Sequence, residues 1–184
     1  RMAMTCGVGI NNAIASGVNM LGDVHGGAGE QALELYQSIL GESSDQSLEN
    51  AIDHALDQSI QKTAFVPGFG HRFHKPEDPR ARPLMELLRQ CAQDDPSIDP
   101  RFADIAEGIQ DAIERRKGKR IAMNIDGATA AIYGALGVPA TLARGLFCLS
   151  RSVGLTAHAY EQSLSNERNK GPTPPSYRWT HDPN

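Results

Sequence analysis

Apolar residues recur at the spacing of an α-helix in nearly every segment of this chain, and this periodicity constrains the fold more than any other feature. Leu33, Tyr36 and Leu40, for example, lie three and four positions apart, on one face of a helix. The alternation of strands and helices that builds a parallel sheet is missing. The pattern therefore predicts an all-α protein, with helices over residues 3–20, 29–40, 48–63, 84–88, 102–116, 128–136 and 142–163.

Three segments do not fit a long regular helix. Residues 65–71, Phe-Val-Pro-Gly-Phe-Gly-His, are too rich in glycine for any regular element and predict a shaped loop. Residues 121–125 fit a short buried strand, but a helical interpretation is at least as good because strong helix formers follow at 128–136. The tail from Asn166 is polar and rich in proline, which favours an extended or partly disordered chain.

The composition argues against several classes of partner and site. The 184 residues carry a formal net charge of −4, so no basic field is available to hold a nucleic acid or an anionic membrane surface. Cys6, Cys91 and Cys148 lie far apart and outside any Cys-x-x-Cys pattern, which argues against a disulfide framework or a zinc site and favours a cytoplasmic setting. No apolar run approaches the roughly 18 residues of a membrane span. The chain opens with Arg1 inside a helical pattern, from which we expect upstream sequence to be missing.

Two histidines and one aspartate interrupt glycine-rich sequence and are candidates for chemistry. His25 stands in Gly-Asp-Val-His-Gly-Gly, His71 ends Pro-Gly-Phe-Gly-His, and Asp126 stands in Asn-Ile-Asp-Gly. Neighbouring glycines let the backbone approach a ligand and direct N–H groups at developing negative charge. Two imidazoles and a carboxylate suffice for proton transfer beside a carbonyl group.

These three residues also have ordinary structural interpretations. Either histidine could be a loop residue bonded to a backbone carbonyl, and Asp126 could simply cap the helix that follows it. His71 and His74 resemble a metal-binding pair, but a third ligand is missing, so no metal site is predicted.

Two arginines could supply the forked contacts that a polycarboxylate needs, namely Arg80 and Arg151. Arg80 could instead pair only with Asp78 or Glu77, and Arg151 could be a solvated residue on an otherwise buried helix. Taken one by one, these signals leave the function open.

Taken together and in order, the motifs resemble the citrate synthase superfamily. That family carries a Gly-Pro-Leu-His-Gly-Gly-Ala segment, a Pro-Gly-Phe/Tyr-Gly-His segment followed by Asp-Pro-Arg, an Asn-Val-Asp segment, and a late arginine with Gly and Ala-His beyond it. The resemblance runs from about Ala13 to Gln162. The matching segments are residues 22–28, 67–71 with 78–80, 124–126, and 150–158.

The resemblance implies an all-helical fold with a large and a small lobe and the active site in the cleft between them. By position, residues 1–27 and 138–184 would belong to the large domain and residues 28–137 to the small domain. The N-terminal part of the large lobe would be missing. The resemblance also implies a homodimer. In the family, one carboxylate-binding arginine comes from the other subunit of the dimer. The candidates for this arginine here are Arg168 and Arg178.

The resemblance further implies a role for each candidate residue. Asp126 would exchange a proton with the methyl carbon of acetyl-CoA, and His25 would hydrogen-bond the thioester oxygen of its enol form. His71 would serve the carbonyl or hydroxyl of the oxaloacetate half, whose carboxylates Arg80 and Arg151 would hold.

Coenzyme A would enter as a thioester substrate, with no bound cofactor and no metal. The residues implied to lie along it are Val66, Pro67, Gly68, Phe69 and Gly70, and Lys75 would approach its phosphates.

Departures from the synthase motifs favour a lyase. Synthases usually continue the aspartate motif as Asp-Phe-Tyr-Ser-Gly, whereas Asp126 is followed by Gly-Ala-Thr, which is similar to citryl-CoA lyases and to the lyase module of ATP-citrate lyase. Gly-His-Arg at residues 70–72 also resembles that branch, and Asp23 stands where synthases have proline. We therefore expect cleavage of citryl-CoA to oxaloacetate and acetyl-CoA through an enol, with His71 removing the hydroxyl proton and Asp126 returning a proton to carbon.

Three alternatives stay open, of which a metal-binding helical protein is the most distant. The direction of such a reaction is set by substrate and coupling rather than by these residues. A citrate or 2-methylcitrate synthase would use the same residues to condense an acyl-CoA with oxaloacetate. A non-catalytic paralogue would keep the cleft and bind coenzyme A without turnover.

Overall fold

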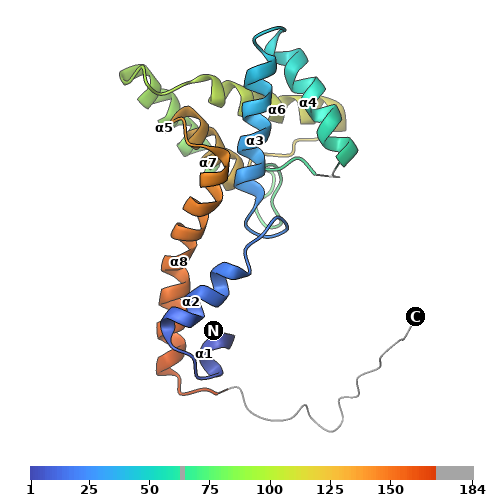
Figure 1. Ribbon diagram of the computed structural model, residues 1–184. Coiled ribbons are helices and arrows are strands. Elements are labelled where there is room, and N and C mark those ends of the chain that lie inside the picture. Colours follow the sequence, from blue (N-terminus) through green and yellow to red (C-terminus); the bar gives the residue numbers. More distant parts are fainter. Residues whose placement is uncertain (63–64, 169–184) are drawn as a thin grey trace, which may run out of the picture. The chain divides into compact units, whose positions relative to one another are not determined.

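The computed structural model describes residues 1–62 and 65–168, and every regular element within these ranges is an α-helix (Figure 1). The prediction of an all-α protein is confirmed. The helices are α1 (Met2–Thr5), α2 (Ile10–Asn19), α3 (Ala28–Glu42), α4 (Leu48–Lys62), α5 (Ala81–Asp94), α6 (Arg101–Lys117), α7 (Ile125–Ala135) and α8 (Ala140–Leu164).

The chain forms two compact units. The larger comprises Leu21–Leu149, and the smaller comprises Arg1–Met20 together with the chain from Ser150. Helix α8 begins in the larger unit and ends in the smaller one. The division into domains at residues 27/28 and 137/138 that the resemblance implies stays a prediction.

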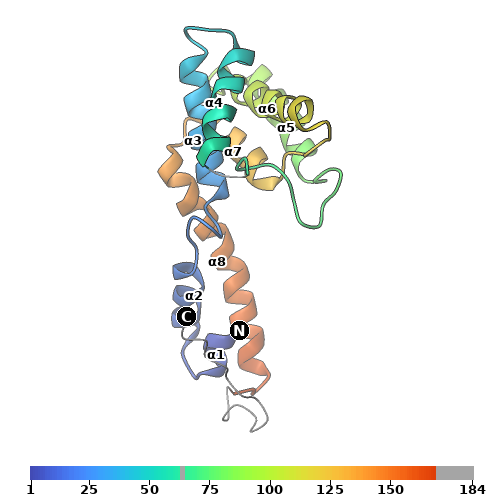
Figure 2. The same cartoon turned by 90° about the vertical axis from the view of Figure 1, so that its right-hand side faces the viewer.

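The core of the larger unit lies between helices α3 to α7, which both views show grouped together (Figures 1 and 2). The apolar positions that carry the helical periodicity point into it. Each fully buried leucine or isoleucine stabilises the fold by about 1.5–3 kcal/mol relative to an exposed one. The largest fully buried side chains of this core are Tyr36, Leu33, Ile39, Leu56, Ile105 and Ile109.

Helix α7 packs against α3, α5 and α6, and its small residues make this possible. Ala128, Ala130 and Ala131 are completely buried. A Cβ atom at Gly134 would lie 2.2 Å from the ring of Phe102, so only glycine fits at this crossing. The run of alanine and glycine after Asp126 therefore forms a central helix that its neighbours approach closely.

The structure corrects two boundaries of the sequence prediction. The predicted helix over residues 3–20 is two helices, because Gly7 turns the chain with φ +86°, and the second helix ends at Asn19. Residues 121–124 are neither a strand nor part of a helix: Met123 forms an isolated bridge with Phe69, and α7 begins only at Ile125. Residue 63 and most of the predicted tail lie outside the described residues.

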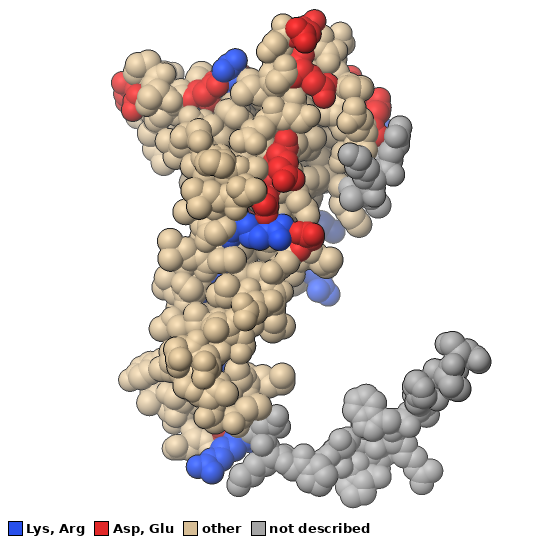
Figure 3. Space-filling view, in the orientation of Figure 1, with Lys and Arg blue, Asp and Glu red and all other residues tan. Residues whose placement is uncertain are grey.

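In the smaller unit, α2 lies against the C-terminal part of α8. A Cβ atom at Gly17 would lie 2.6 Å from the side chain of Leu155, so this glycine allows a close helix contact. None of the described helices combines the length and the apolar character that a membrane span needs. On the face shown in Figure 3, basic side chains lie beside acidic ones rather than in one basic field.

Candidate active site

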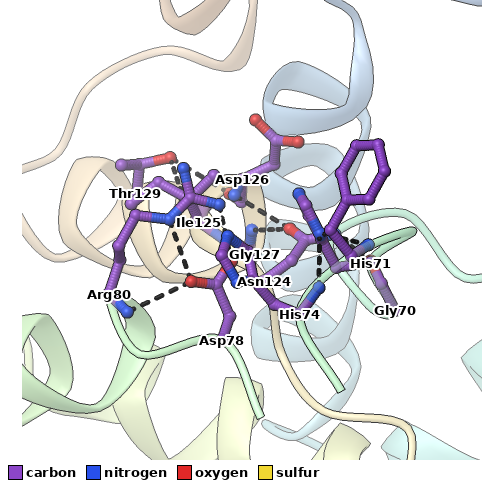
Figure 4. A network of polar contacts seen from close by, with 11 residues as sticks. Gly70, His71, His74, Asp78, Arg80, Asn124, Ile125, Asp126, Gly127 and Thr129 are labelled. Carbon is purple, nitrogen blue, oxygen red and sulfur yellow. Dashed lines mark hydrogen bonds and ion pairs between the residues drawn. The ribbon is translucent and has the colours of Figure 1, made fainter. Parts of the chain in front are cut away.

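The glycine-rich segment of residues 65–71, called the His71 loop below, is bonded to the residues that precede α7. Gly70 N donates to Ala122 O at 2.8 Å, and Asn124 N donates to Gly68 O at 2.9 Å. The side chain of Asn124 adds a third bond, from Nδ2 to Gly70 O at 2.7 Å. These bonds place His71 beside the first turn of α7, which carries Asp126 (Figure 4).

The first turn of α7 is capped by Asn124 rather than by Asp126. The Oδ1 atom of Asn124 accepts from the backbone N–H groups of Asp126 at 2.9 Å and Gly127 at 3.2 Å, which is the usual geometry of an asparagine N-cap. The interpretation of Asp126 as the cap is therefore wrong. Its carboxylate belongs to the first turn, where the helix dipole favours negative charge.

A contact between two glycines sets the distance between the His71 loop and α7. A Cβ atom at Gly127 would lie 2.4 Å from the carbonyl oxygen of Gly68, closer than any side chain permits. Gly68 itself has φ +85°, a conformation that glycine adopts without strain. The glycine that follows Asp126 is thus required by the approach of the loop.

The imidazole of His71 is oriented by its own loop. Its Nδ1 atom accepts from the backbone N–H groups of Phe73 and His74, both at 3.0 Å. An Nδ1 atom that accepts two bonds carries no proton, so in the neutral ring the proton is on Nε2. His71 therefore offers a hydrogen-bond donor, which differs from the proton-removing role expected from the sequence.

The His71 and His74 rings lie close, with centroids 4.4 Å apart, but their packing does not create a metal site. The Nδ1 atom of His71 is occupied by the two backbone donors. Among residues 1–62 and 65–168, no group of three or more His, Cys, Asp or Glu side chains is arranged to hold a metal ion.

Arg80 is held by Asp78, the nearby acid that was one of its possible partners. Arg80 Nε donates to Asp78 Oδ1 at 2.9 Å and Nη2 donates to Oδ2 at 2.8 Å. The bonds to Asp78 do not involve Nη1 of Arg80. The other candidate acid, Glu77, pairs with Arg120 at 3.1 Å instead. Pairing with Asp78 orients the guanidinium, and a carboxylate ligand could still bind its outer edge.

Asp78 also joins this arginine to α7. Its side chain is only 1% exposed, while that of Arg80 is 46% exposed, and Ile125 N donates to Asp78 Oδ2 at 3.2 Å. The hydrogen bond from Arg80 holds the pKa of Asp78 well below its usual range, against the opposing effect of burial. The pKa of Arg80 is raised, mainly by this bond and more weakly by the charge of Asp126. Figure 4 shows His71, Arg80 and Asp126 around the same turn.

His25 lies in a second loop, residues 22–27, called the His25 loop below. Its backbone oxygen accepts from Gly22 N at 2.8 Å, and its side chain is exposed. The loop leads into α3, where Ala32 approaches the His71 loop: a Cβ atom at Gly68 would lie 3.1 Å from that of Ala32. Within the described residues, however, the polar network around Asp126 does not extend to the His25 imidazole.

The remaining predicted site residues differ in how far they are exposed to solvent. In the His71 loop, Val66 is buried, whereas Phe69 is partly exposed. Lys75 is exposed in the segment that follows the loop. Arg151 is exposed on α8, in the part that belongs to the smaller unit. The two candidates for an arginine across the dimer are untested: Arg168 is exposed at the end of the described chain, and Arg178 lies outside it.

The sequence prediction missed the positioning roles of Asn124 and Asp78. The first had a recognisable signal, because asparagine immediately before an alanine-rich helix is a strong N-cap. The bond from Ile125 N to Asp78 had no such signal, since it joins residues 47 positions apart.

Known proteins resemble this chain over most of its length. Residues 1–174 match the family model described as citrate synthase, C-terminal domain. The citrate synthase of Heyndrickxia coagulans is 32% identical over 158 residues, which are 85% of this chain and 39% of that protein. The chain thus spans well under half the length of this curated relative.

Two solved structures extend the comparison. Citryl-CoA lyase from Hydrogenobacter thermophilus superposes with a TM-score of 0.77 at 33% identity, covering 100% of this chain and 68% of that chain. The ternary complex of citrate synthase from Thermoplasma acidophilum with carboxymethyl coenzyme A and oxaloacetate has a TM-score of 0.61 at 26% identity, covering 88% and 42% of the two chains. With the family match and the ordered motifs, these likenesses show that the chain belongs to the citrate synthase superfamily of enzymes.

Proposed function

We propose that this protein is a citryl-CoA lyase, which splits citryl-CoA into oxaloacetate and acetyl-CoA. The observation that carries the proposal is the contact between Gly127 and the carbonyl oxygen of Gly68, immediately beside Asp126. The phenylalanine that usually follows the aspartate in synthases would collide with this carbonyl. The likeness to a citryl-CoA lyase over the whole chain supports the same conclusion.

The first step of the proposed reaction concerns the hydroxyl group of citryl-CoA. As this hydroxyl loses its proton to solvent, the electrons of the adjacent carbon–carbon bond move into the thioester and produce the acetyl-CoA enolate. The Nε2–H group of His71 donates to the oxygen that becomes the ketone of oxaloacetate and stabilises its negative charge. The exposed side of the Arg80 guanidinium, held by Asp78, binds a carboxylate of the same half.

The second step protonates the enolate. His25 hydrogen-bonds the thioester oxygen, and Asp126 delivers a proton to the methylene carbon, which becomes the methyl group of acetyl-CoA. Asp126 regains a proton from solvent, so one proton leaves and one enters in each turnover. Arg151 is proposed to bind a second carboxylate.

The partners proposed on the basis of the family resemblance are small molecules and a second copy of the chain. Coenzyme A acts as the thioester part of the substrate and lies along the His71 loop, with Lys75 toward its phosphates. The carboxylate end of the substrate is of the oxaloacetate or citrate type. A cytoplasmic homodimer is the assembly that we expect.

The fate of citryl-CoA tests the proposal. The full-length protein is expected to convert it to oxaloacetate and acetyl-CoA, measured by reduction of oxaloacetate with a coupled dehydrogenase. Asp126→Ala should slow this conversion by about a thousandfold, whereas Asp111→Ala, which removes an exposed acid on α6, should leave its rate unchanged.

Two other outcomes would reject the lyase assignment. Release of free coenzyme A thiol and citrate, with condensation of acetyl-CoA and oxaloacetate, would identify a synthase. Binding of coenzyme A without turnover, unchanged by Asp126→Ala, would identify a non-catalytic paralogue.

A further inference from the structure

An arginine of α8 forms ion pairs with acids on both sides of His25. Arg144 Nη2 donates to Asp23 Oδ1 at 2.5 Å, and Arg144 Nε forms an ion pair with Glu30 Oε2. Asp23 belongs to the His25 loop, and Glu30 belongs to the first turn of α3. All of these residues lie in the larger unit.

These two ion pairs differ in their exposure to solvent. The side chain of Glu30 is only 13% exposed and that of Arg144 is 32% exposed, and the ion-paired atoms Nε and Oε2 are buried without a hydrogen bond between them. The side chain of Asp23, in contrast, is 76% exposed. The pKa of Arg144 is raised, mainly by its hydrogen bond to Asp23. Arg144 thus stays charged and pairs with one largely buried carboxylate, that of Glu30, and one exposed carboxylate, that of Asp23.

The backbone of the His25 loop is compact on the side that faces α8. Gly26 has φ +98°, and a Cβ atom there would lie 3.1 Å from the ring of Phe147, which is one helical turn after Arg144. A Cβ atom at Gly27 would lie 2.9 Å from the Cα atom of Asp23. The loop therefore lies against α8 through one aromatic contact and one charged contact.

We propose that Arg144 is a positioning residue that holds the His25 loop, and with it the His25 imidazole, through simultaneous pairing with Asp23 and Glu30. The proposal rests on the proposed function, in which His25 donates to the thioester oxygen. The two acids lie two residues before and five residues after His25, so the arginine restrains the loop at both ends. A displacement of about 1 Å in a catalytic group can cost on the order of a hundredfold in rate.

Arginine suits this position because its planar group carries several donors in fixed directions. Nε faces one acid and Nη2 faces the other. A lysine presents a single ammonium point charge, so Arg144→Lys is expected to restore only part of what Arg144→Gln removes. Asp23→Asn offers a milder test because Asp23 is largely exposed, and this variant leaves the buried pair with Glu30 in place.

The first experiment needs no substrate. Amide hydrogen exchange over residues 21–31 is compared in the full-length protein, Arg144→Gln and Asp23→Asn, with Arg82→Gln as the matched control, since Arg82 pairs with Glu86 on α5. Exchange in this segment is expected to become about threefold faster in Asp23→Asn, which loses one exposed ion pair, and about tenfold faster in Arg144→Gln, which loses both pairs, with no change in the control. Unchanged exchange in Asp23→Asn would overturn the proposal even if Arg144→Gln does not fold.

The second experiment measures citryl-CoA cleavage. For Arg144→Gln, kcat is expected to fall by about ten- to a hundredfold while KM changes by less than about threefold, because His25 acts mainly on the enolate. The double variant with Asp23→Asn should lose no more than Arg144→Gln alone. Kinetics equal to those of Arg82→Gln would refute the positioning role. If the unsubstituted protein neither cleaves nor condenses, the proposed function fails, and hydrogen exchange still decides whether Arg144 holds the loop.

Discussion

The two loops that carry the candidate histidines are held by different interactions. The His71 loop is joined to the segment before α7 by bonds between uncharged groups, from Gly70 N to Ala122 O and from Asn124 to Gly68 O and Gly70 O. The His25 loop lies close to Phe147 at Gly26, and ion pairs join Arg144 to Asp23 in the loop and to Glu30 in the first turn of α3. These attachments of the His71 loop are between uncharged groups, whereas those of the His25 loop include ion pairs.

Because of this difference, the two loops should respond to different perturbations. Uncharged backbone bonds and a glycine contact respond to changes in shape but hardly to salt. Ion pairs with an exposed member respond to salt and to removal of a single charge. The two halves of the site should therefore be separable by experiment, although both are proposed to act on one substrate.

The largest effect should come from removing the carboxylate that the His71 loop faces. Asp126→Ala is expected to lower kcat for citryl-CoA cleavage by about a thousandfold, within the range for loss of general acid catalysis. The thermal midpoint should stay close to that of the unsubstituted protein because Asn124, not Asp126, caps α7. A rate within about tenfold of the original would assign the proton transfer to another group.

The contact between Gly127 and Gly68 O predicts that a side chain at position 127 lowers the stability of the protein. Gly127→Ala places a methyl group 2.4 Å from Gly68 O and is expected to lower the free energy of unfolding by about 1–3 kcal/mol. Gly29→Ala is the matched control in α3, where a Cβ atom meets nothing within 4 Å. It should leave stability unchanged or raise it by up to about 1 kcal/mol. Urea unfolding measures both, and equal effects would mean that the contact does not restrain the loop.

The lowered pKa of Asp78 predicts that the stability of the fold depends on pH. Because its pKa is lowered in the folded chain, its carboxylate stabilises the fold at pH above about 4, the value for an unfolded aspartate. This stabilisation is lost as the pH falls below about 4, toward the lowered pKa. Asp78→Asn should cost about 1–3 kcal/mol at neutral pH and should show a weaker loss of stability than the original protein between about pH 4 and pH 2.

The control for this titration is Glu77→Gln, which removes an exposed acid paired with Arg120. Its expected cost is below about 1 kcal/mol. Chemical unfolding at several pH values distinguishes the two variants. Parallel stability curves for Asp78→Asn and the original protein would show that the Asp78 carboxylate is not the group that titrates.

The smallest expected effect is that of salt on amide exchange, and it compares the two loops directly. Raising the salt concentration to about 1 M shortens the screening length to about 3 Å. Exchange of the amides in residues 22–27 should become roughly twofold faster, while those in residues 68–71 should not change. An equal response of both loops would contradict the distinction between a charged and an uncharged attachment.

Much of the fold could be predicted because the spacing of apolar residues along the chain determines where helices form. The apolar spacing around Leu33 and Tyr36 indicates a helix, and α3 lies there with both side chains buried. The break at Gly7 was missed because a single glycine does not disclose a positive φ angle. The start of α7 was uncertain because the bond from Asn124 N to Gly68 O depends on a residue 56 positions away.

The amino-acid sequence by itself determined the helical class and the family and named candidate site residues, because these follow from periodicity along the chain and from short motifs. Only the tertiary structure decided that Nδ1 of His71 accepts two backbone bonds, that Asn124 caps the helix bearing Asp126, and that Arg144 pairs with Asp23 and Glu30. These arrangements depend on contacts between segments distant along the chain. Spacing along the sequence carries no information on which of the available donors and acceptors meet in space.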